Sequence, residues 1–226
     1  MSTAARLFTP GPLTTSTTVK GAMMTDLGSR DPAFIKVVAE VRSGLLAMGG
    51  VASPAYECVI MQGSGTFGVE SVLGSCAGRG GKLLVGVNGS YGERMVRMAE
   101  VLGIPLAKPI RVNEDAALSA QAVVAAAAAD PGITTVACVH HETTAGVLNP
   151  IHEIGQGLAK LPHKPTFIVD SMSAFGECVC QSWSMCLPMD AMLSGHFPGF
   201  FFADAAVPPL PCPPFLHPLS PQVPTP

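Results

Sequence analysis

The sequence has little charge and few aromatic side chains. Of its 226 residues, 13% are charged and 6% aromatic, and the formal net charge is −3. A balance of this sign disfavours a broad nucleic-acid-binding surface, because neutralising phosphates takes clustered lysine and arginine. Hydrophobic residues nevertheless make up 48% of the chain, which is too many for a chain that is disordered throughout. The composition predicts a folded protein with a sizeable core.

Long apolar runs are also lacking. No run reaches the roughly 18 residues that a membrane span needs, and the most apolar stretch, 123–139, is broken at Asp130. The first six residues contain no apolar core of a secretory signal. Pro10 and Pro12 interrupt any early helix of a mitochondrial presequence. We therefore expect a cytoplasmic protein that does not bind a membrane.

The cysteines do not suggest a disulfide framework. Their number, seven, is odd, and no CxxC pair occurs, which fits a reducing compartment. The spacing of Cys178, Cys180 and Cys186 is compatible with a metal site, but irregular sequence rich in small apolar residues explains it better. We expect no metal.

Basic residues are absent from the last part of the chain. No lysine or arginine follows Lys164, whereas residues 165–226 carry four acids. Nine of the 20 residues in 207–226 are proline, which lacks an N–H and fixes φ, so this segment can continue neither a helix nor a central strand. We expect 207–226 to form an extended or disordered tail.

Residues 33–170 alternate between strand-like and helical patterns. Strand-like runs cover 82–87, 106–112, 133–139 and 166–170, and helical patterns cover 34–48, 69–76, 91–102, 116–129 and 151–161. This alternation predicts an α/β fold with a mainly parallel sheet covered by helices.

Two candidate binding features lie where a predicted strand and a predicted helix meet. The glycine-rich loop 62–68 offers backbone N–H groups and hydroxyls to a phosphate at the start of a helix. Asp170 ends an apolar strand, and ligands of open α/β sheets bind beyond the carboxyl ends of strands. An ordinary tight turn for the loop, and a helix-capping or turn role for Asp170, remain open.

Two further junctions carry polar side chains. His140, His141 and Glu142 follow the strand 133–139, but consecutive side chains of an extended chain point opposite ways and do not easily converge. We favour Thr143 as the hydroxyl donor of this loop. Tyr91 follows the strand 82–87 and could stack on a planar ligand, while a plain surface or core tyrosine fits equally well.

Six short motifs in this order resemble those of class V aminotransferases, which use pyridoxal 5′-phosphate (PLP). They are LFTPGPLTT (7–15), LGSRD (27–31), QGSGT (62–66), NGSYGERM (88–95), HETTAG (141–146) and IVDSMSAFG (168–176). The resemblance implies the large domain of an aspartate aminotransferase-like PLP-transferase. We expect an N-terminal segment over 1–19 and the PLP-binding domain over 20–206, incomplete after about residue 177, with the C-terminal small domain missing.

The resemblance also implies roles for the residues at the junctions. Ser64, Gly65 and Thr66 would cradle the phosphate of PLP. Tyr91 would stack on the ring, Thr143 would hydrogen-bond its 3-oxygen, and Asp170 would pair with the protonated pyridine nitrogen. Family members are homodimers, so a partner copy is expected, with the apolar segment 7–13 against the core or the partner.

The choice of substrate comes from the same resemblance. The opening motif and the residues after Asp170 favour members that transfer the amino group of 2-aminoethylphosphonate to pyruvate, in phosphonate catabolism, giving phosphonoacetaldehyde and alanine. Two alternatives remain open: another class V activity, such as alanine–glyoxylate transamination, and a catalytically inactive interaction protein with the PLP fold.

One family feature has no counterpart. The resemblance implies a Schiff-base lysine between a strand like 189–194 and a segment like 198–203, but only Gly195, His196 and Phe197 lie between them. We therefore expect the Schiff-base lysine to be absent and the activity of this chain to be impaired.

Overall fold

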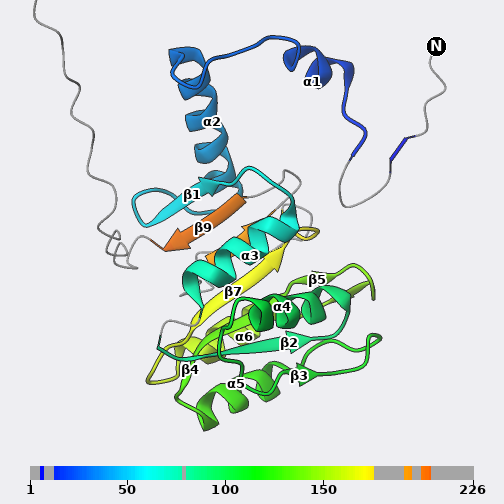
Figure 1. Cartoon of the computed structure of the whole chain (residues 1–226), viewed down its shortest axis with the longest axis vertical. Helices are drawn as coiled ribbons and strands as arrows, with labels where there is room; N and C mark the ends of the chain where they lie inside the picture. Colours follow the sequence, from blue (N-terminus) through cyan, green and yellow to red (C-terminus); the bar gives the residue numbers. More distant parts are fainter. Residues whose placement is uncertain (1–5, 8–12, 78–79, 176–190, 195–199, 205–226) are drawn as a thin grey trace, which may run out of the picture.

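A computed structural model describes residues 6–7, 13–77, 80–175, 191–194 and 200–204 (Figure 1). The proline-rich tail, the three C-terminal-half cysteines at 178–186 and the segment 195–197 lie outside the described residues. In the described ranges, no helix combines the length and hydropathy needed to cross a bilayer. The division into a segment 1–19 and a domain 20–206 remains a prediction.

Seven strands form the main sheet, in the order β1-β9-β8-β7-β4-β2-β3. From β3 to β8 all neighbours are parallel, whereas β9 is antiparallel to both β8 and β1. The predicted mainly parallel α/β sheet is therefore confirmed. The strands are β1 (Tyr56–Ile60), β2 (Lys82–Val87), β3 (Ile110–Arg111), β4 (Ile133–Val139), β7 (Thr166–Ser171), β8 (Ala191–Ser194) and β9 (Phe200–Asp204), and a separate hairpin contains β5 (His141–Glu142) and β6 (Val147–Leu148).

Helices connect the strands and cover the sheet (Figure 1). Side-chain caps define several of their first turns: Asp31 caps α2, Ser64 caps α3 and Ser119 caps α5. The helices are α1 (Thr17–Ala22), α2 (Pro32–Met48), α3 (Gly65–Cys76), α4 (Ser90–Val101), α5 (Ala120–Ala129) and α6 (Ile151–Ala159).

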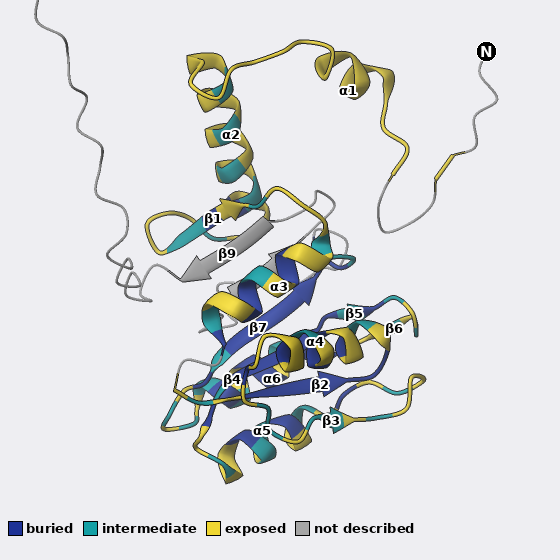
Figure 2. Ribbon diagram, in the orientation of Figure 1, coloured by how far each residue is buried: buried dark blue, intermediate teal, exposed yellow. Residues whose placement is uncertain are grey.

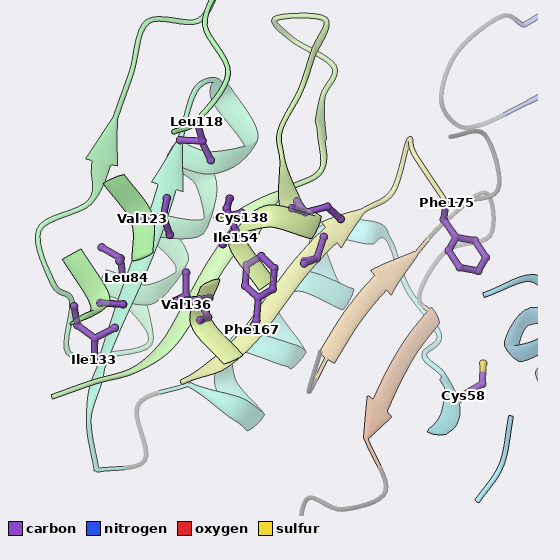
Figure 3. Packing of buried hydrophobic residues seen from close by; sticks show 14 of the residues in the cluster. Cys58, Leu84, Leu118, Val123, Ile133, Val136, Cys138, Ile154, Phe167 and Phe175 are labelled. Atoms are coloured by element: carbon purple, nitrogen blue, oxygen red, sulfur yellow. The ribbon is translucent and has the colours of Figure 1, made fainter. Parts of the chain in front are cut away.

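Successive side chains of the central strands point to opposite faces of the sheet, so a hydrophobic core forms on each face. Figure 2 shows these strands as the most deeply buried part of the molecule, and Figure 3 shows Phe167 beside Ile154 and Val136. Leu83, Val85, Ala137, Val139 and Ile168 belong to the cluster that includes α3 and α4, whereas Leu84, Val136, Cys138, Phe167 and Val169 belong to the cluster that includes α5 and α6.

Three predicted boundaries shift for local reasons. The expected strand 106–112 is reduced to β3 and an isolated bridge at Leu106, because Pro109 has no N–H for a ladder. The helix expected from 116 begins only after Ser119, whose hydroxyl accepts from the amide of Ala122. The helix expected from 69 instead begins at Gly65, so the glycine-rich loop is partly the first turn of α3.

The helix α2 projects from the sheet, and much of its surface is exposed (Figure 2). Its apolar stripe matches the predicted helical spacing, but Val37 and Val41 are exposed and Leu45 is only half-buried. Met23 and Met24, just after α1, are among the most exposed hydrophobic residues of the described chain. The α1–α2 arm therefore presents apolar surface that this chain does not cover.

Candidate functional site

The four predicted junctions open onto one edge of the sheet. Because β9 is antiparallel to both β1 and β8, β1 runs in the same direction as β8 and the other parallel strands. The carboxyl ends of β1, β2, β4 and β7 therefore lie along the same edge. α3 follows β1, α4 follows β2, and the β5–β6 hairpin follows β4.

Strand alternation assigns Asp170 to one face of this edge. Ile168, two residues earlier in β7, packs in the cluster of α3 and α4, so Asp170 points to that face as well. Ser171 points to the other face, where its hydroxyl lies 2.9 Å from Nδ1 of His140. The helices that carry the phosphate-loop residues and Tyr91 cover the same face as Asp170.

Direct contacts join α3 to α4 and to the turn after Asp170. Gly65 touches the Met172 side chain so closely that a Cβ at position 65 would collide with the methyl group of Met172. Arg94 donates from Nη1 to the hydroxyl oxygen of Thr66 at 3.1 Å. The Arg94 guanidinium carbon also lies 4.9 Å from the centroid of the Tyr91 ring, a cation–π distance.

The first turn of α3 has the donors of an anion site. Ser64 uses its hydroxyl to accept from the amide of Phe67 at 3.2 Å. No residue in the described ranges accepts a hydrogen bond from the amides of Gly65 and Thr66. Since Thr66 already accepts from Arg94, its hydroxyl hydrogen remains available as a donor. Two amides, a hydroxyl and the positive end of a helix suit a phosphate group.

The first turn of α4 is, in contrast, already filled. Its amides at Tyr91 and Gly92 donate to Oε2 of Glu142 at 3.1 and 3.2 Å, and the amide of Ser90 donates to the Thr144 hydroxyl at 3.2 Å. An internal carboxylate thus occupies the place where an anion would bind. Of the two glycine-rich junctions, only that of α3 keeps first-turn amides without an acceptor among the described residues.

Asp170 is a buried carboxyl group, and only one of its oxygens has a hydrogen-bond donor among the described residues. Its side chain is 8% exposed, and Oδ1 accepts from the amide of Met172 at 3.0 Å. No described residue donates to Oδ2. The pKa of Asp170 is raised from 3.8 to about 6: burial is the largest cause and raises it, the Met172 amide lowers it, Glu142 raises it and Arg94 lowers it. A cationic donor supplied by a ligand would offset the cost of this buried charge.

The histidines and Thr143 lie in or next to the hairpin after β4. As expected, the three consecutive side chains diverge: His140 contacts Ser171, His141 contacts Ser173, and Glu142 reaches α4. Burial lowers the pKa of His140 to about 4, so it is neutral at physiological pH. Thr143 is half-buried, and no described residue hydrogen-bonds its side chain. In the described ranges, no three acidic, histidine or cysteine side chains form a metal site.

Among the described residues, no lysine of the sheet domain lies at the edge that carries Asp170. Lys160 and Lys164 precede β7, whose far end carries Asp170. Lys82 begins β2 and pairs with Asp130 at 2.7 Å, and Lys108 precedes β3. No lysine is among the charged groups that shift the pKa of Asp170.

The sequence did not predict the contacts that three residues make in this site: Arg94, Glu142 and Met172. Arg94 is three residues after Tyr91, a spacing that places both on one side of a helix, so this signal was available. Glu142 and Met172 contact residues 50 or more positions away in the sequence. No local sequence pattern predicts such contacts.

Known proteins are similar to this chain in sequence and in fold. No family model matches the chain. The chain is similar to 2-aminoethylphosphonate–pyruvate transaminases from Pseudomonas putida, at 43% identity over 84% of this chain and 48% of the relative, and from Rhizobium meliloti, at 47% identity over 75% and 44%. Among solved structures, it is similar to pyridoxamine–pyruvate aminotransferase from Mesorhizobium loti, with a TM-score of 0.76 and 27% identity over 89% of this chain and 52% of that one. The chain spans about half the length of the curated relatives it matches.

Proposed function

From its homology to 2-aminoethylphosphonate–pyruvate transaminases and its class V aminotransferase fold, we propose that this chain is the PLP-binding part of a transaminase. The proposed reaction moves the amino group of 2-aminoethylphosphonate to pyruvate. The observation that carries the proposal is the position of Asp170, buried at the carboxyl end of β7 on the face where the α3 amides are unfilled. A buried carboxylate opposite an anion site matches a ligand with a cationic ring nitrogen and a phosphate.

We propose that these residues hold the two ends of PLP. The amides of Gly65 and Thr66, with the Ser64 and Thr66 side chains beside them, would hold the phosphate. Oδ2 of Asp170 would hold the pyridine nitrogen. The hydroxyl of Thr143, which has no hydrogen-bond partner among the described residues, would serve the ring 3-oxygen.

Each residue has a distinct task in the proposed reaction. PLP, when bound, supplies an electron sink for the substrate carbon that loses a proton. Asp170 would keep the ring nitrogen protonated, because an ionised carboxylate in a buried site strongly favours a cationic partner. Tyr91 would fix the plane of the ring and exclude water from one side. The α3 amides would anchor the phosphate, so that the ring cannot turn away from Asp170.

We further propose that this chain alone binds PLP without a covalent bond and transaminates only at background rate. A transaminase of this type needs a lysine amine to form the covalent bond and move the proton. None of the lysines of the sheet domain lies at the edge that carries Asp170, and no lysine follows Lys164.

The proposed partners are the two small substrates and a second copy of the chain. Leu7 and Leu13 are 47% and 42% exposed, so they do not pack against the core of this chain, and the α1–α2 arm adds further apolar surface. Sedimentation at several concentrations tests the dimer, and a monodisperse monomer would contradict it. Cys58 and Cys138 form no disulfide with another described residue, which fits the cytoplasm as the proposed compartment.

Titration with PLP, followed by its absorbance and by equilibrium dialysis, tests the proposed site. We expect saturable one-to-one binding that weakens at least tenfold in Asp170→Ala, because the buried ionic partner is lost. The matched control is Asp130→Ala, which removes an exposed acid at the opposite edge of the sheet and should leave PLP affinity unchanged. Equal loss in both variants, or no binding by the parent chain, would refute the proposal.

A further inference from the structure

Glu142 is buried without a lysine or arginine partner. It is fully buried, yet no ion pair is formed with it among the described residues. Burial of an ionised carboxylate is costly unless hydrogen bonds satisfy it. The donors to Glu142 therefore identify what this side chain does.

These donors come from two places. Oε2 accepts from the amides of Tyr91 and Gly92, and Oε1 accepts from the Thr144 hydroxyl at 2.6 Å and, more weakly, from the Thr144 amide at 3.4 Å. The Thr144 hydroxyl in turn accepts from the amide of Ser90. Glu142 and Thr144 together satisfy the first three amides of α4.

The helix has no other cap. The residue before α4 is Gly89, which has no side chain to offer, and no side-chain cap is formed there. A side chain at position 89 would also collide with Glu142, since a Cβ there would overlap Cγ of Glu142. The glycine thus makes room for a carboxylate from a distant part of the chain to act as the N-terminal cap.

We propose that Glu142, assisted by Thr144, is a positioning residue that fixes the first turn of α4 and thereby holds the Tyr91 ring in place for PLP. The inference rests on the proposed PLP site. Tyr91 is the second residue of α4, and the amide that Glu142 binds is its own. If this turn frays, the ring loses its fixed position, although Tyr91 itself is unchanged.

Hydrogen exchange tests the cap without any cofactor. In Glu142→Gln, the side chain keeps only one acceptor oxygen. Its NH2 group takes the place of the other oxygen and therefore faces an N–H or O–H donor. We expect exchange at the Tyr91 and Gly92 amides to accelerate roughly tenfold, on the scale of a lost helix cap. Exchange in β2 and β4 should stay as in the parent chain, which shows that the fold persists. Unchanged protection at Tyr91 and Gly92 would overturn the proposal.

A double-mutant cycle tests the link to Tyr91. PLP affinity is measured at pH 8, where Asp170 is ionised, for the parent chain, Glu142→Gln, Tyr91→Leu and the double variant. We expect Glu142→Gln to weaken binding roughly five- to tenfold alone and to have no further effect when Tyr91 is already replaced. Additive losses would show that Glu142 does not act through Tyr91.

Three further variants guard against a general loss of structure. Thr144→Val removes the acceptor for Ser90 and should also weaken PLP binding, whereas the conservative Thr144→Ser should retain it. The control Glu100→Gln neutralises an exposed acid of the same helix and should change nothing. If the parent chain does not bind PLP, the proposed site fails, but exchange at Tyr91 and Gly92 still decides whether Glu142 caps α4.

Discussion

Replacing Asp170 by asparagine should stabilise the protein in the absence of PLP. The pKa of Asp170 rises from 3.8 to about 6, with burial as the largest cause. A raised pKa means that the folded state prefers the neutral carboxyl. The favourable contribution is therefore complete below about pH 4 and is lost as the pH rises through 6. Asparagine is never charged, and its Oδ1 can still accept from the Met172 amide.

The size of the effect follows from the pKa change. Each tenfold change in proton affinity corresponds to about 1.4 kcal/mol, so ionised Asp170 costs the folded state about 3 kcal/mol. At pH 8, Asp170→Asn should be more stable than the parent chain by about this amount. Because a chain of this size gains roughly 2–4 °C per kcal/mol, the unfolding midpoint should rise by roughly 6–12 °C. At pH 4 the two proteins should be nearly equal.

Urea and thermal unfolding of both proteins without cofactor, at pH 4 and pH 8, measure this difference. Comparison at each pH cancels other titrating groups, such as Glu93 and Asp130, whose pKa values are lowered by ion pairs present in both proteins. The same variant should bind PLP more weakly at pH 8. A stability gain that does not depend on pH, or no gain at pH 8, would refute the reasoning.

Three other perturbations test different parts of the structure. Arg94→Met removes a cation that lowers the pKa of Asp170. The loss of stability between pH 4 and pH 8 should therefore shift to higher pH. PLP affinity should also fall roughly tenfold, because Thr66 loses a charged donor. Phe167→Ala should lower the free energy of unfolding by about 3–5 kcal/mol, as expected for a fully buried phenylalanine, and urea unfolding measures it. Borohydride reduction of the PLP-loaded chain should leave no stoichiometric adduct on any single lysine by mass spectrometry; such an adduct together with turnover would show that a present lysine has taken the role.

Local patterns predicted the part of the fold that local forces determine. The strand Lys82–Val87 and the helix Pro32–Met48 have periodicities that no tertiary contact needed to override. β1 was not predicted from the sequence. Its five residues pair, among the described strands, only with β9, which lies far along the chain. The apolar stripe of α2 was read correctly as a helix face, but its spacing could not reveal that this chain leaves much of it exposed.

The candidate site also combines features that the sequence predicts with features that depend on contacts between distant residues. Strand-to-helix junctions are visible in sequence, so the α3 loop and Asp170 could be named in advance. Which junction keeps free amides for the proposed phosphate depends on Glu142, which reaches α4 from 50 positions away. Only the three-dimensional arrangement shows that one of two similar glycine-rich turns is closed by the protein itself.

The antiparallel strand β9 has a consequence for the order in which the chain folds during synthesis. Among the described strands, β1 pairs only with β9, with Tyr56 opposite Asp204. Roughly 140 residues separate the two strands, so roughly 7–28 s passes on the ribosome before β1 can find its partner. For that time β1 is an unpaired edge open to wrong pairing. Arg42 of α2 offers early protection, since it donates to the Cys58 carbonyl at 2.7 Å and to Glu57 at 2.6 Å. The α2–β1 unit can therefore hold its own strand in shape long before the strand that locks it into the sheet has been made.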